Sequence, residues 1–251
     1  MNINLLTWNI WFDENNRDRR TLHILEESFI NKPDFIAFQE VVRETAELIF
    51  KHKKDYHVIG YPLTQAYDTL ILSKYPCIEW NRYSLPETQM GRNLLIAKFN
   101  VNGVNEVYDN ISIATFHLES VFNFKKDSEN NVKFRQLQYI NDITPNKCIL
   151  MGDTNICENF DSSSIGLVDI FDKICQPEAF KNTYSGKSNT NIKRKNLNSR
   201  LDRIYLKNIS NNIHSFFLTG TIPNLFNHIS GKYCHPSDHY GVFSSLSITS
   251  P

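Results

Sequence analysis

The sequence of 251 residues has no excess of either charge, few cysteines and no long hydrophobic run. Lysine plus arginine equals aspartate plus glutamate at 27 each, so the overall charge does not attract the protein to nucleic acids or membranes, and any site for a polyanion has to be local. The five cysteines are widely spaced and form no CxxC pair, which argues against a disulfide framework and a zinc knuckle. A reducing, intracellular compartment is therefore the simplest interpretation.

The hydropathy pattern argues against secretion and membrane insertion. The first ten residues, "MNINLLTWNI", lack the basic segment and longer apolar segment of a signal peptide. No stretch approaches the roughly 18 apolar residues of a transmembrane helix. We predict an intracellular protein without membrane contacts, and no signal favours the nucleus over the cytoplasm.

The composition is typical of a folded protein with a large core. Hydrophobic residues make up 41% of the chain and aromatic residues 12%, and no linker or internal repeat divides it. We therefore expect residues 1–251 to form one domain.

Predicted strands and helices alternate early in the chain, and strands dominate the last third. Leu22, Leu25 and Phe29 recur at helical spacing, and residues 133–143 have apolar side chains at steps of three. This order indicates an α/β fold of mixed sheets flanked by helices. Apolar runs bounded by turn residues predict strands near 4–10, 35–41, 56–60, 69–73, 93–101, 110–120, 148–153, 200–207, 214–220 and 240–248.

Acidic, amide and imidazole side chains gather where the predicted strands begin or end. Because strand ends in an α/β protein share a rim, these groups can converge there. Asp153 and Asn155 are two residues apart, as are His117 and Glu119, so each pair can face one way from an extended strand. The set comprises Asn9, Gln39, Glu40, His117, Glu119, Asp153, Asn155, Asp202, Asp238 and His239.

Several carboxylates on one rim repel one another unless a cation neutralises them. Hard oxygen ligands favour Mg²⁺ or Mn²⁺ over zinc, and such a cation beside a histidine and an Asp/Asn pair can hydrolyse a phosphate ester. Each motif alone also has a structural explanation, such as a strand-end amide for Asn9, an ion-paired rim residue for Glu40 and an Asx turn for residues 153–155. The combination favours the metal-dependent hydrolase.

Six short motifs occur in an order that resembles one known superfamily. "TWN" (7–9), "QEV" (39–41), "HLES" (117–120), "GDTN" (152–155), "RLDRI" (200–204) and "PSDHYG" (236–241) together resemble the endonuclease/exonuclease/phosphatase superfamily. "HLES", "GDTN" and "MGRNLL" (90–95) resemble its tyrosyl-DNA phosphodiesterase 2 branch most closely.

The resemblance implies a fold and an activity. The fold is a four-layer α/β sandwich, with two mixed β-sheets packed face to face and helices outside, and residues 1–251 would be a single catalytic domain. The activity is Mg²⁺-dependent (or Mn²⁺-dependent) hydrolysis of the 5′-phosphotyrosyl bond between a tyrosine and a nucleic acid during DNA repair, leaving a 5′ phosphate.

The resemblance also assigns the metal and the attacking water to particular residues. Glu40, Asp153 and Asp238 would hold the metal, and Asn9 would position the metal-bound phosphate. Asp153 would orient or deprotonate the attacking water, with Asn155 beside it.

The two remaining catalytic assignments are histidines. His239, braced by Asp238, and His117 would contact the phosphate oxygens and stabilise charge in the transition state. A tyrosyl leaving group has a pKa of about 10, so its departure needs less help from a general acid than an alkoxide does.

Further residues would bind the substrate. Cys157 stands where the superfamily branch has an arginine, and Tyr184 stands where it has a tryptophan that could stack on a base. The basic loop 193–195 is either a contact for the DNA backbone or a solvated loop. The predicted substrate-binding set is Arg92, Asn93, Ser120, Tyr184, Arg200, Asp202 and Arg203.

The predicted partner is DNA with a 5′-tyrosyl adduct, or the equivalent RNA, and the predicted state is a monomer.

Three alternatives to the proposed activity remain open. The first is another member of the superfamily, such as an abasic-site nuclease or a phosphoinositide phosphatase. The second is a non-catalytic binding module, and the third is a zinc hydrolase built on His117, Glu119, His235 and His239.

Overall fold

The computed structural model describes residues 1–101, 110–120, 126–157, 161–174, 180–228 and 231–248, and most of its strands lie in two six-stranded sheets, A and B. Sheet A contains, in spatial order, β13 (Asn211–Thr219), β16 (Gly241–Ile248), β1 (Asn2–Asn9), β2 (Phe35–Val41), β4 (Asp68–Ser73) and β3 (His57–Ile59). Sheet B contains β5 (Cys77–Ser84), β6 (Asn93–Phe99), β7 (Ile111–His117), β8 (Cys148–Asp153), β12 (Asp202–Lys207) and β9 (Val168–Asp169). Both sheets are mixed, because β1 and β2 are parallel in A, β7 and β8 are parallel in B, and the other neighbours are antiparallel.

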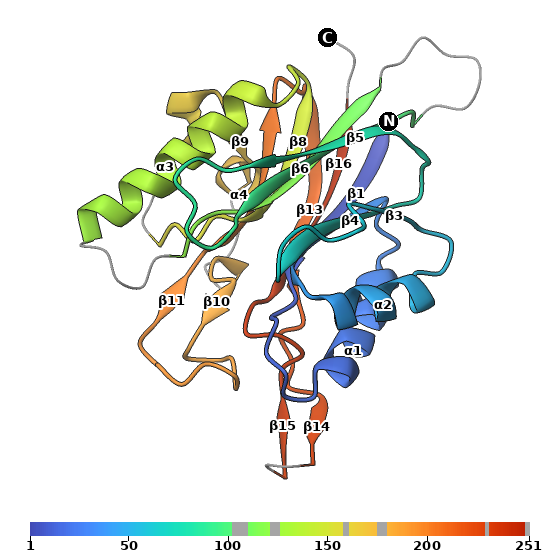
Figure 1. The fold of residues 1–251 in the computed structure, drawn as a ribbon, viewed down its shortest axis with the longest axis vertical. Helices are drawn as coiled ribbons and strands as arrows, with labels where there is room; N and C mark the ends of the chain where they lie inside the picture. The colour runs from blue at the N-terminus through green and yellow to red at the C-terminus, as the bar shows by residue number, and fades with distance from the viewer. Residues whose placement is uncertain (102–109, 121–125, 158–160, 175–179, 229–230, 249–251) are drawn as a thin grey trace.

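Helices lie outside the two sheets, on opposite sides of the molecule (Figure 1). α1 (Arg17–Ile30) and α2 (Arg43–His52) lie on one side, and α3 (Lys126–Ile143) lies on the other. The shorter elements are a 3₁₀ turn (Ser162–Ile165), α4 (Ile170–Lys173) and two small hairpins, β10 (Tyr184–Ser185) with β11 (Asn198–Ser199) and β14 (Leu225–Asn227) with β15 (Lys232–Cys234).

Alternating side chains along the strands build three apolar layers. Leu5 of β1 packs in the core between the sheets, and its neighbour Leu6 packs in the core that includes residues of α1 and α2. Likewise Ile149 of β8 faces the central core, and Leu150 faces the core shared with α3. Burying each such side chain stabilises the fold by about 1.5–3 kcal/mol. The predicted four-layer α/β sandwich is confirmed.

The same strand pairing brings distant motifs to one rim. In the parallel pair of sheet A, Asn9 lies opposite Gln39, and in sheet B His117 lies opposite Asp153. Asp202 lies opposite Asp153 from the antiparallel neighbour β12. In the described parts of the chain, no helix is long and apolar enough to cross a membrane.

Candidate active site

The two sheets meet at a buried amide. Asn9 at the end of β1 is fully buried, and its Nδ2 donates to Glu40 Oε1 at 3.1 Å and to Asp153 Oδ2 at 2.9 Å. Glu40 belongs to sheet A and Asp153 to sheet B, so this side chain joins two carboxylates across the sandwich. Both amide hydrogens are used, which places the Asn9 Oδ1 atom on its other side, where it accepts from the backbone N–H of Trp11 at 3.0 Å.

Two site residues have left-handed backbones that only glycine adopts readily. Glu40 has φ 59° and lies where the β2–β4 register shifts, and Asn155 has φ 50°. Such residues typically cost about 1 kcal/mol or more and persist when their surroundings hold them. The backbone N–H of Phe12 donates to Glu40 Oε2 at 3.1 Å, and Asn155 Nδ2 donates to the Leu118 carbonyl at 3.1 Å. Both side chains are therefore fixed toward the rim.

Asp153 lies at the centre of the rim and is almost completely buried. Its Oδ2 atom is 2.9 Å from Asn9 Nδ2, 3.4 Å from His117 Nε2 and 3.8 Å from His239 Nε2. Burial alone would raise the pKa of Asp153, but the two histidine rings and the N–H groups of Asn9 and Asn155 hold it below its ordinary value. The carboxylate is therefore ionised and can orient a water molecule.

His239 has a carboxylate partner on the far side of its ring. Its Nδ1 donates to Asp202 Oδ2 at 2.8 Å. Burial would lower the pKa of His239, but Asp202 and Asp153 raise it well above its ordinary value. The hydrogen-bond partner of this ring is Asp202, which was predicted to bind substrate, whereas Asp238, the predicted brace, adds only to the charge that raises the pKa of His239.

The Nδ1 atom of His117 faces a cation, where the Nδ1 atom of His239 faces a carboxylate. Arg92 Nη1 donates to His117 Nδ1 at 2.8 Å, and both side chains are buried. A guanidinium has no acceptor, so Nδ1 is unprotonated and the ring hydrogen lies on Nε2, which faces Asp153. Burial and then the charge of Arg92 lower the pKa of His117 well below its ordinary value. This histidine is a neutral donor.

The carboxylates on the rim fit a hard divalent cation. Burial, Glu40 and Asp153 raise the pKa of Asp238 to about 7, although His239 opposes this. The predicted ligands Glu40, Asp153 and Asp238 offer only oxygen atoms, which Mg²⁺ or Mn²⁺ would prefer. Among the described residues, the group found with ligand atoms close together is a different one. Asp153, Asp202 and His239 place ligand atoms within 4.8 Å of one another. The bond between His239 Nδ1 and Asp202 Oδ2 leaves the buried Asp202 Oδ1 without a hydrogen-bond partner.

The alternative zinc set is not brought together as predicted. Glu119 Oε2 accepts from Thr88 and Gln89 at 2.8 and 3.0 Å. His235 contacts Thr190 at 2.9 Å through Nδ1 and the Thr221 carbonyl at 3.1 Å through Nε2. Both ring nitrogens of His235 are thus occupied by structural contacts.

Some predicted substrate residues lie at the rim. The ring of Tyr184 meets that of His239 edge to face at a centroid distance of 5.1 Å. Ser120 is half-buried three residues beyond His117, and Cys157 is exposed two residues beyond Asn155.

Three other predicted substrate residues are engaged elsewhere. Arg200 and Arg203 both bond Asp169 Oδ2, at 2.6 and 3.2 Å. Asn93 Nδ2 donates to Asp68 Oδ1 at 2.8 Å. Buried carboxylates thus bind these three side chains in the structure, and their contact with substrate stays a prediction.

The structure also places residues in the site that the sequence analysis missed. Phe12 follows the first motif and is 45% exposed, and its ring stacks on Tyr67 at 5.2 Å. The guanidinium of Arg92 lies over the Tyr67 ring at 5.1 Å. An exposed aromatic pair beside a cation is a typical binding surface. The available signal was "WF" (11–12), two large aromatic residues directly after a predicted strand.

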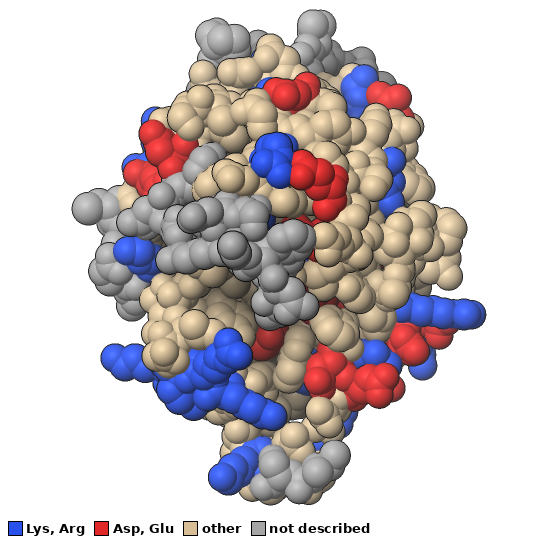
Figure 2. Space-filling view, turned by 60° about the vertical axis from the view of Figure 1, so that its left-hand side comes forward, with Lys and Arg blue, Asp and Glu red and all other residues tan. Residues whose placement is uncertain are grey.

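The β10–β11 hairpin adds positive charge beside the catalytic segment. Its connecting loop is anchored by Asn189 and Asn191, whose amides donate to the carbonyl of Ser237 at 3.0 Å each. Lys193 and Arg194 in this loop are exposed. The hairpin lies at the lower left of Figure 1, and Figure 2, turned to bring that side forward, shows lysine and arginine side chains gathered low on this face.

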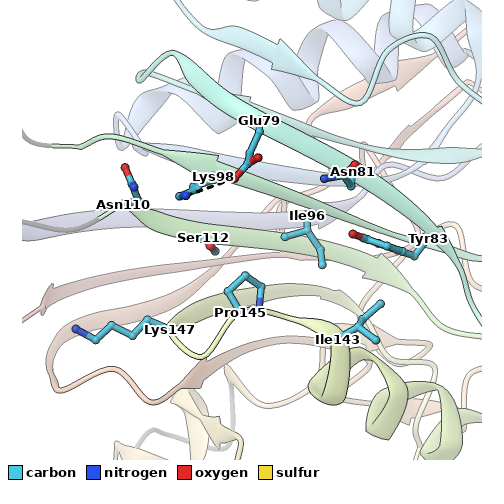
Figure 3. A pocket seen from close by; sticks show the side chains of 10 residues that line it. All are labelled: Glu79, Asn81, Tyr83, Ile96, Lys98, Asn110, Ser112, Ile143, Pro145 and Lys147. Carbon is cyan, nitrogen blue, oxygen red and sulfur yellow. Dashed lines mark ion pairs between the residues drawn. The ribbon is translucent and has the colours of Figure 1, made fainter.

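A separate cavity of about 340 Å³ lies on sheet B (Figure 3). Its lining comes from β5, β6, the start of β7 and the segment between α3 and β8, and includes Tyr83, Lys98, Ser112 and Lys147. Glu79 pairs with Lys98 at 3.4 Å inside it. None of the predicted site residues lines this cavity, so it is distinct from the catalytic rim.

Comparison with known proteins agrees with the fold and with the family that the motifs indicated. The family model described as "Endonuclease/Exonuclease/phosphatase family" matches residues 6–239. The chain therefore belongs to the endonuclease/exonuclease/phosphatase family, as its motifs predicted.

The similar relatives carry one name. Tyrosyl-DNA phosphodiesterase 2 of Xenopus tropicalis is 27% identical over 257 residues, which covers 97% of this chain and 65% of that protein. The protein of the same name from Xenopus laevis is 28% identical over 260 residues, covering 97% and 66%. The chain thus spans about two thirds of the length of these relatives, and the predicted resemblance to this branch is confirmed.

Solved structures show the same fold. The structure of D. rerio TDP2 complexed with single-strand DNA product has a TM-score of 0.82 at 22% identity, covering 98% of this chain and 99% of that one. A Bacteroides thetaiotaomicron protein of the endonuclease/exonuclease/phosphatase family has a TM-score of 0.76 at 15% identity, covering 100% and 99%.

Proposed function

We propose that this chain is a metal-dependent phosphodiesterase of DNA repair that hydrolyses the 5′-phosphotyrosyl bond between a tyrosine and a nucleic acid, leaving a 5′ phosphate. The observation that carries the proposal is the position of Asp153, whose Oδ2 lies within 4 Å of Nε2 atoms from one neutral and one cationic histidine. The name shared by the similar relatives supports the choice of substrate.

The residues of the rim divide the work of an in-line displacement. Asp153 orients the attacking water as an ionised carboxylate, because its pKa is lowered. His239, protonated through its partner Asp202, stabilises the negative charge on the phosphate oxygens, and His117 donates one further hydrogen bond through Nε2. Glu40, Asp153 and Asp238 would hold a Mg²⁺ or Mn²⁺ ion, which supplies Lewis-acid polarisation of the phosphate when bound.

An aryl leaving group suits this set of groups. A phenol has a pKa of about 10, so it can depart as a phenolate without a strong general acid. Since His117 is held neutral by Arg92, it has no spare proton to give to a poorer leaving group. The site can therefore hydrolyse a tyrosyl ester without proton donation by His117.

The nucleic acid would be held locally, since the net charge of the chain is zero. Tyr184 offers a ring for base stacking, and Lys193 and Arg194 offer charges for the backbone. We further propose that residues 1–251 act as a single domain, as a monomer and inside the cell, on DNA or on RNA with the same 5′ adduct.

The first test is hydrolysis of a 5′-phosphotyrosyl single-stranded oligonucleotide with and without Mg²⁺. We expect release of tyrosine that depends on the metal and is lost in Asp153→Asn. Asp142→Asn, which changes an exposed carboxylate on α3, is the matched control and should keep full activity.

Two other substrates test the choice of reaction. Abasic-site duplex DNA and a phosphoinositide are incubated under the same conditions. Metal-dependent cleavage of either one, without release of tyrosine from the oligonucleotide, would keep the family assignment and reject the proposed substrate.

A further inference from the structure

The inner face of α3 carries two polar side chains among its apolar ones. Lys133 is 3% exposed and Gln136 is fully buried, whereas Leu137 and Ile140 fill the core next to them. Lysine is rarely buried unless its ammonium has partners. Gln136 Oε1 accepts from the backbone N–H of Glu119 at 2.9 Å, so this face of the helix contacts a segment of the rim.

Lys133 contacts the Asp-Thr-Asn turn directly. Its Nζ donates to the carbonyl of Asn155 at 2.8 Å. Asn155 is the residue with φ 50°, and its backbone N–H donates to Asp153 Oδ1 at 2.8 Å while its side chain donates to Leu118. The turn is thus bonded at its amide, its side chain and its carbonyl, and Lys133 supplies the bond to the carbonyl from a different element.

A second lysine, on sheet B, also donates to backbone carbonyls, but far from the rim. Lys207, at the last position of β12, donates to the carbonyl of Thr144 at 2.8 Å and to the carbonyl of Asn141. Asn141 lies in the last turn of α3, and Thr144 follows the helix directly. β12 begins at Asp202 on the rim, so Lys207 lies at its opposite end. The two lysines fix α3 to sheet B at opposite ends of the strands.

We propose that Lys133 is a positioning residue for catalysis, which holds the left-handed backbone of Asn155 so that Asp153 and Asn155 face the reacting phosphate. This inference rests on the proposed function. Asn155 Nδ2 donates one of its two hydrogens to Leu118, which leaves its second N–H as a donor for a phosphate oxygen and its Oδ1 as an acceptor for water, and rotation of the turn would withdraw both. Lys133 itself does not touch the substrate.

The test compares Lys133→Met with Lys207→Met, since each variant loses one buried or half-buried ammonium that donates to backbone carbonyls. We expect Lys133→Met to lower kcat on the 5′-phosphotyrosyl oligonucleotide by about 10- to 100-fold with little change in KM, because misplacement by about 1 Å costs this much. Lys207→Met should keep kcat at comparable thermal stability. Lys133→Arg, which retains a cationic donor, should recover part of the rate.

Amide hydrogen exchange gives a readout that does not depend on activity. In Lys133→Met the amides of Asn155 and Ile156, which bond Asp153 Oδ1 and Thr154 Oγ1, should exchange faster. In Lys207→Met the change should be confined to the region of Thr144.

Equal kcat and unchanged exchange at Asn155 in Lys133→Met would overturn the positioning role. If the wild-type protein releases no tyrosine at all, the proposed function fails, and faster exchange at Asn155 alone would still show that Lys133 orders the turn. Unchanged exchange would then reject both.

Discussion

His117 and His239 point the same ring nitrogen at the same carboxylate, and they differ in what lies behind them. Their Nε2 atoms are 3.4 and 3.8 Å from Asp153 Oδ2. Behind His117 lies the guanidinium of Arg92, and behind His239 lies the carboxylate of Asp202, each at 2.8 Å from Nδ1. One histidine is therefore neutral and the other cationic, which shows that the buried partner decides the role of the residue.

Removing the carboxylate partner of His239 should lower kcat more than removing the cationic partner of His117. In Asp202→Asn the ring loses the charge that raises its pKa, and we expect kcat to fall by about 10⁴-fold, in line with the carboxylate partner of a catalytic histidine in another enzyme. Activity that needs protonated His239 declines as the pH rises through its raised pKa, so in the variant this alkaline limb moves to lower pH. The measurement is kcat against pH.

The control for this experiment is Asp142→Asn, which also removes one carboxylate but leaves the rim intact. An alkaline limb at the same pH in Asp202→Asn and in wild type would show that Asp202 does not set the protonation of His239.

Removing the partner of His117 should have the next largest effect. Arg92→Met takes away the donor at Nδ1 and the charge that helps lower the ring's pKa, so the pKa of His117 should rise toward its ordinary value. We expect kcat to fall by about 10²-fold, as for loss of a fixed donor, with a new decline of the rate on the acid side where the ring gains a proton. Long-range ¹H–¹⁵N spectra of the His117 ring report the tautomer directly.

Arg135→Met is the matched control, because Arg135 forms an exposed ion pair with Glu87 at 2.6 Å. A His117 ring that keeps its Nε2–H tautomer in Arg92→Met would mean that Asp153 alone fixes it.

Asp238, the third carboxylate of the rim, should make the stability of the fold depend on pH. The pKa of Asp238 is about 7 in the folded chain against an ordinary 3.8, so the folded state holds a proton that the unfolded state has released between these values. Without metal, stability should therefore decrease as the pH rises from about 4 to 7. Asp238→Asn should be more stable than wild type above pH 7 by on the order of 1–3 kcal/mol and equal to it below pH 4.

Added Mg²⁺ should reverse the order of stability of wild type and Asp238→Asn. Thermal unfolding is measured at pH 7.5 in a chelator and then in excess Mg²⁺, which stabilises the form that binds it. Wild type should gain stability with Mg²⁺, and Asp238→Asn should gain little. The same Mg²⁺-dependent gain in both proteins would remove Asp238 from the metal site.

The fold and most of the rim could be predicted because they depend on local patterns. Apolar runs predicted the strands, and residues at the carboxyl ends of neighbouring parallel strands meet at one edge of the sheet. Asn9 and Glu40 lie close together for this reason, and Asp153 meets them from the other sheet across the sandwich. The helix predicted from the spacing of Leu22, Leu25 and Phe29 also exists and spans Arg17–Ile30.

The partners of the histidines could not be predicted, because they depend on register and on long side chains. Asp238 is adjacent to His239 in sequence, but the ring bonds Asp202, which the pairing of β12 with β8 places opposite Asp153. Likewise Arg200 and Arg203 carry the right charge for a phosphate, yet Asp169 on the neighbouring β9 binds both. Charge alone does not show whether a cation is available.

The smallest expected effect concerns the nucleic acid on the side of His239. Lys193 and Arg194 are exposed in a loop that Asn189 and Asn191 hold against the segment before His239. If both cations contact phosphates, the double change Lys193→Ala/Arg194→Ala should raise KM for a single-stranded phosphotyrosyl oligonucleotide by about 3- to 10-fold. It should also reduce the slope of log KM against log salt by about 1.4, since each contact to a single strand contributes about 0.7.

A control of equal charge separates this contact from the general field of the protein. Arg43→Ala/Lys51→Ala removes two exposed cations from α2 and should leave the salt slope unchanged. In the loop variant, kcat for a phosphotyrosyl mononucleotide, which has no further phosphates, should also be unchanged. Equal slopes in all three proteins would mean that the loop is only solvated. The strand would then leave the rim past Phe12 and Tyr67, on the side of His117, and a Phe12→Ala variant should raise KM instead.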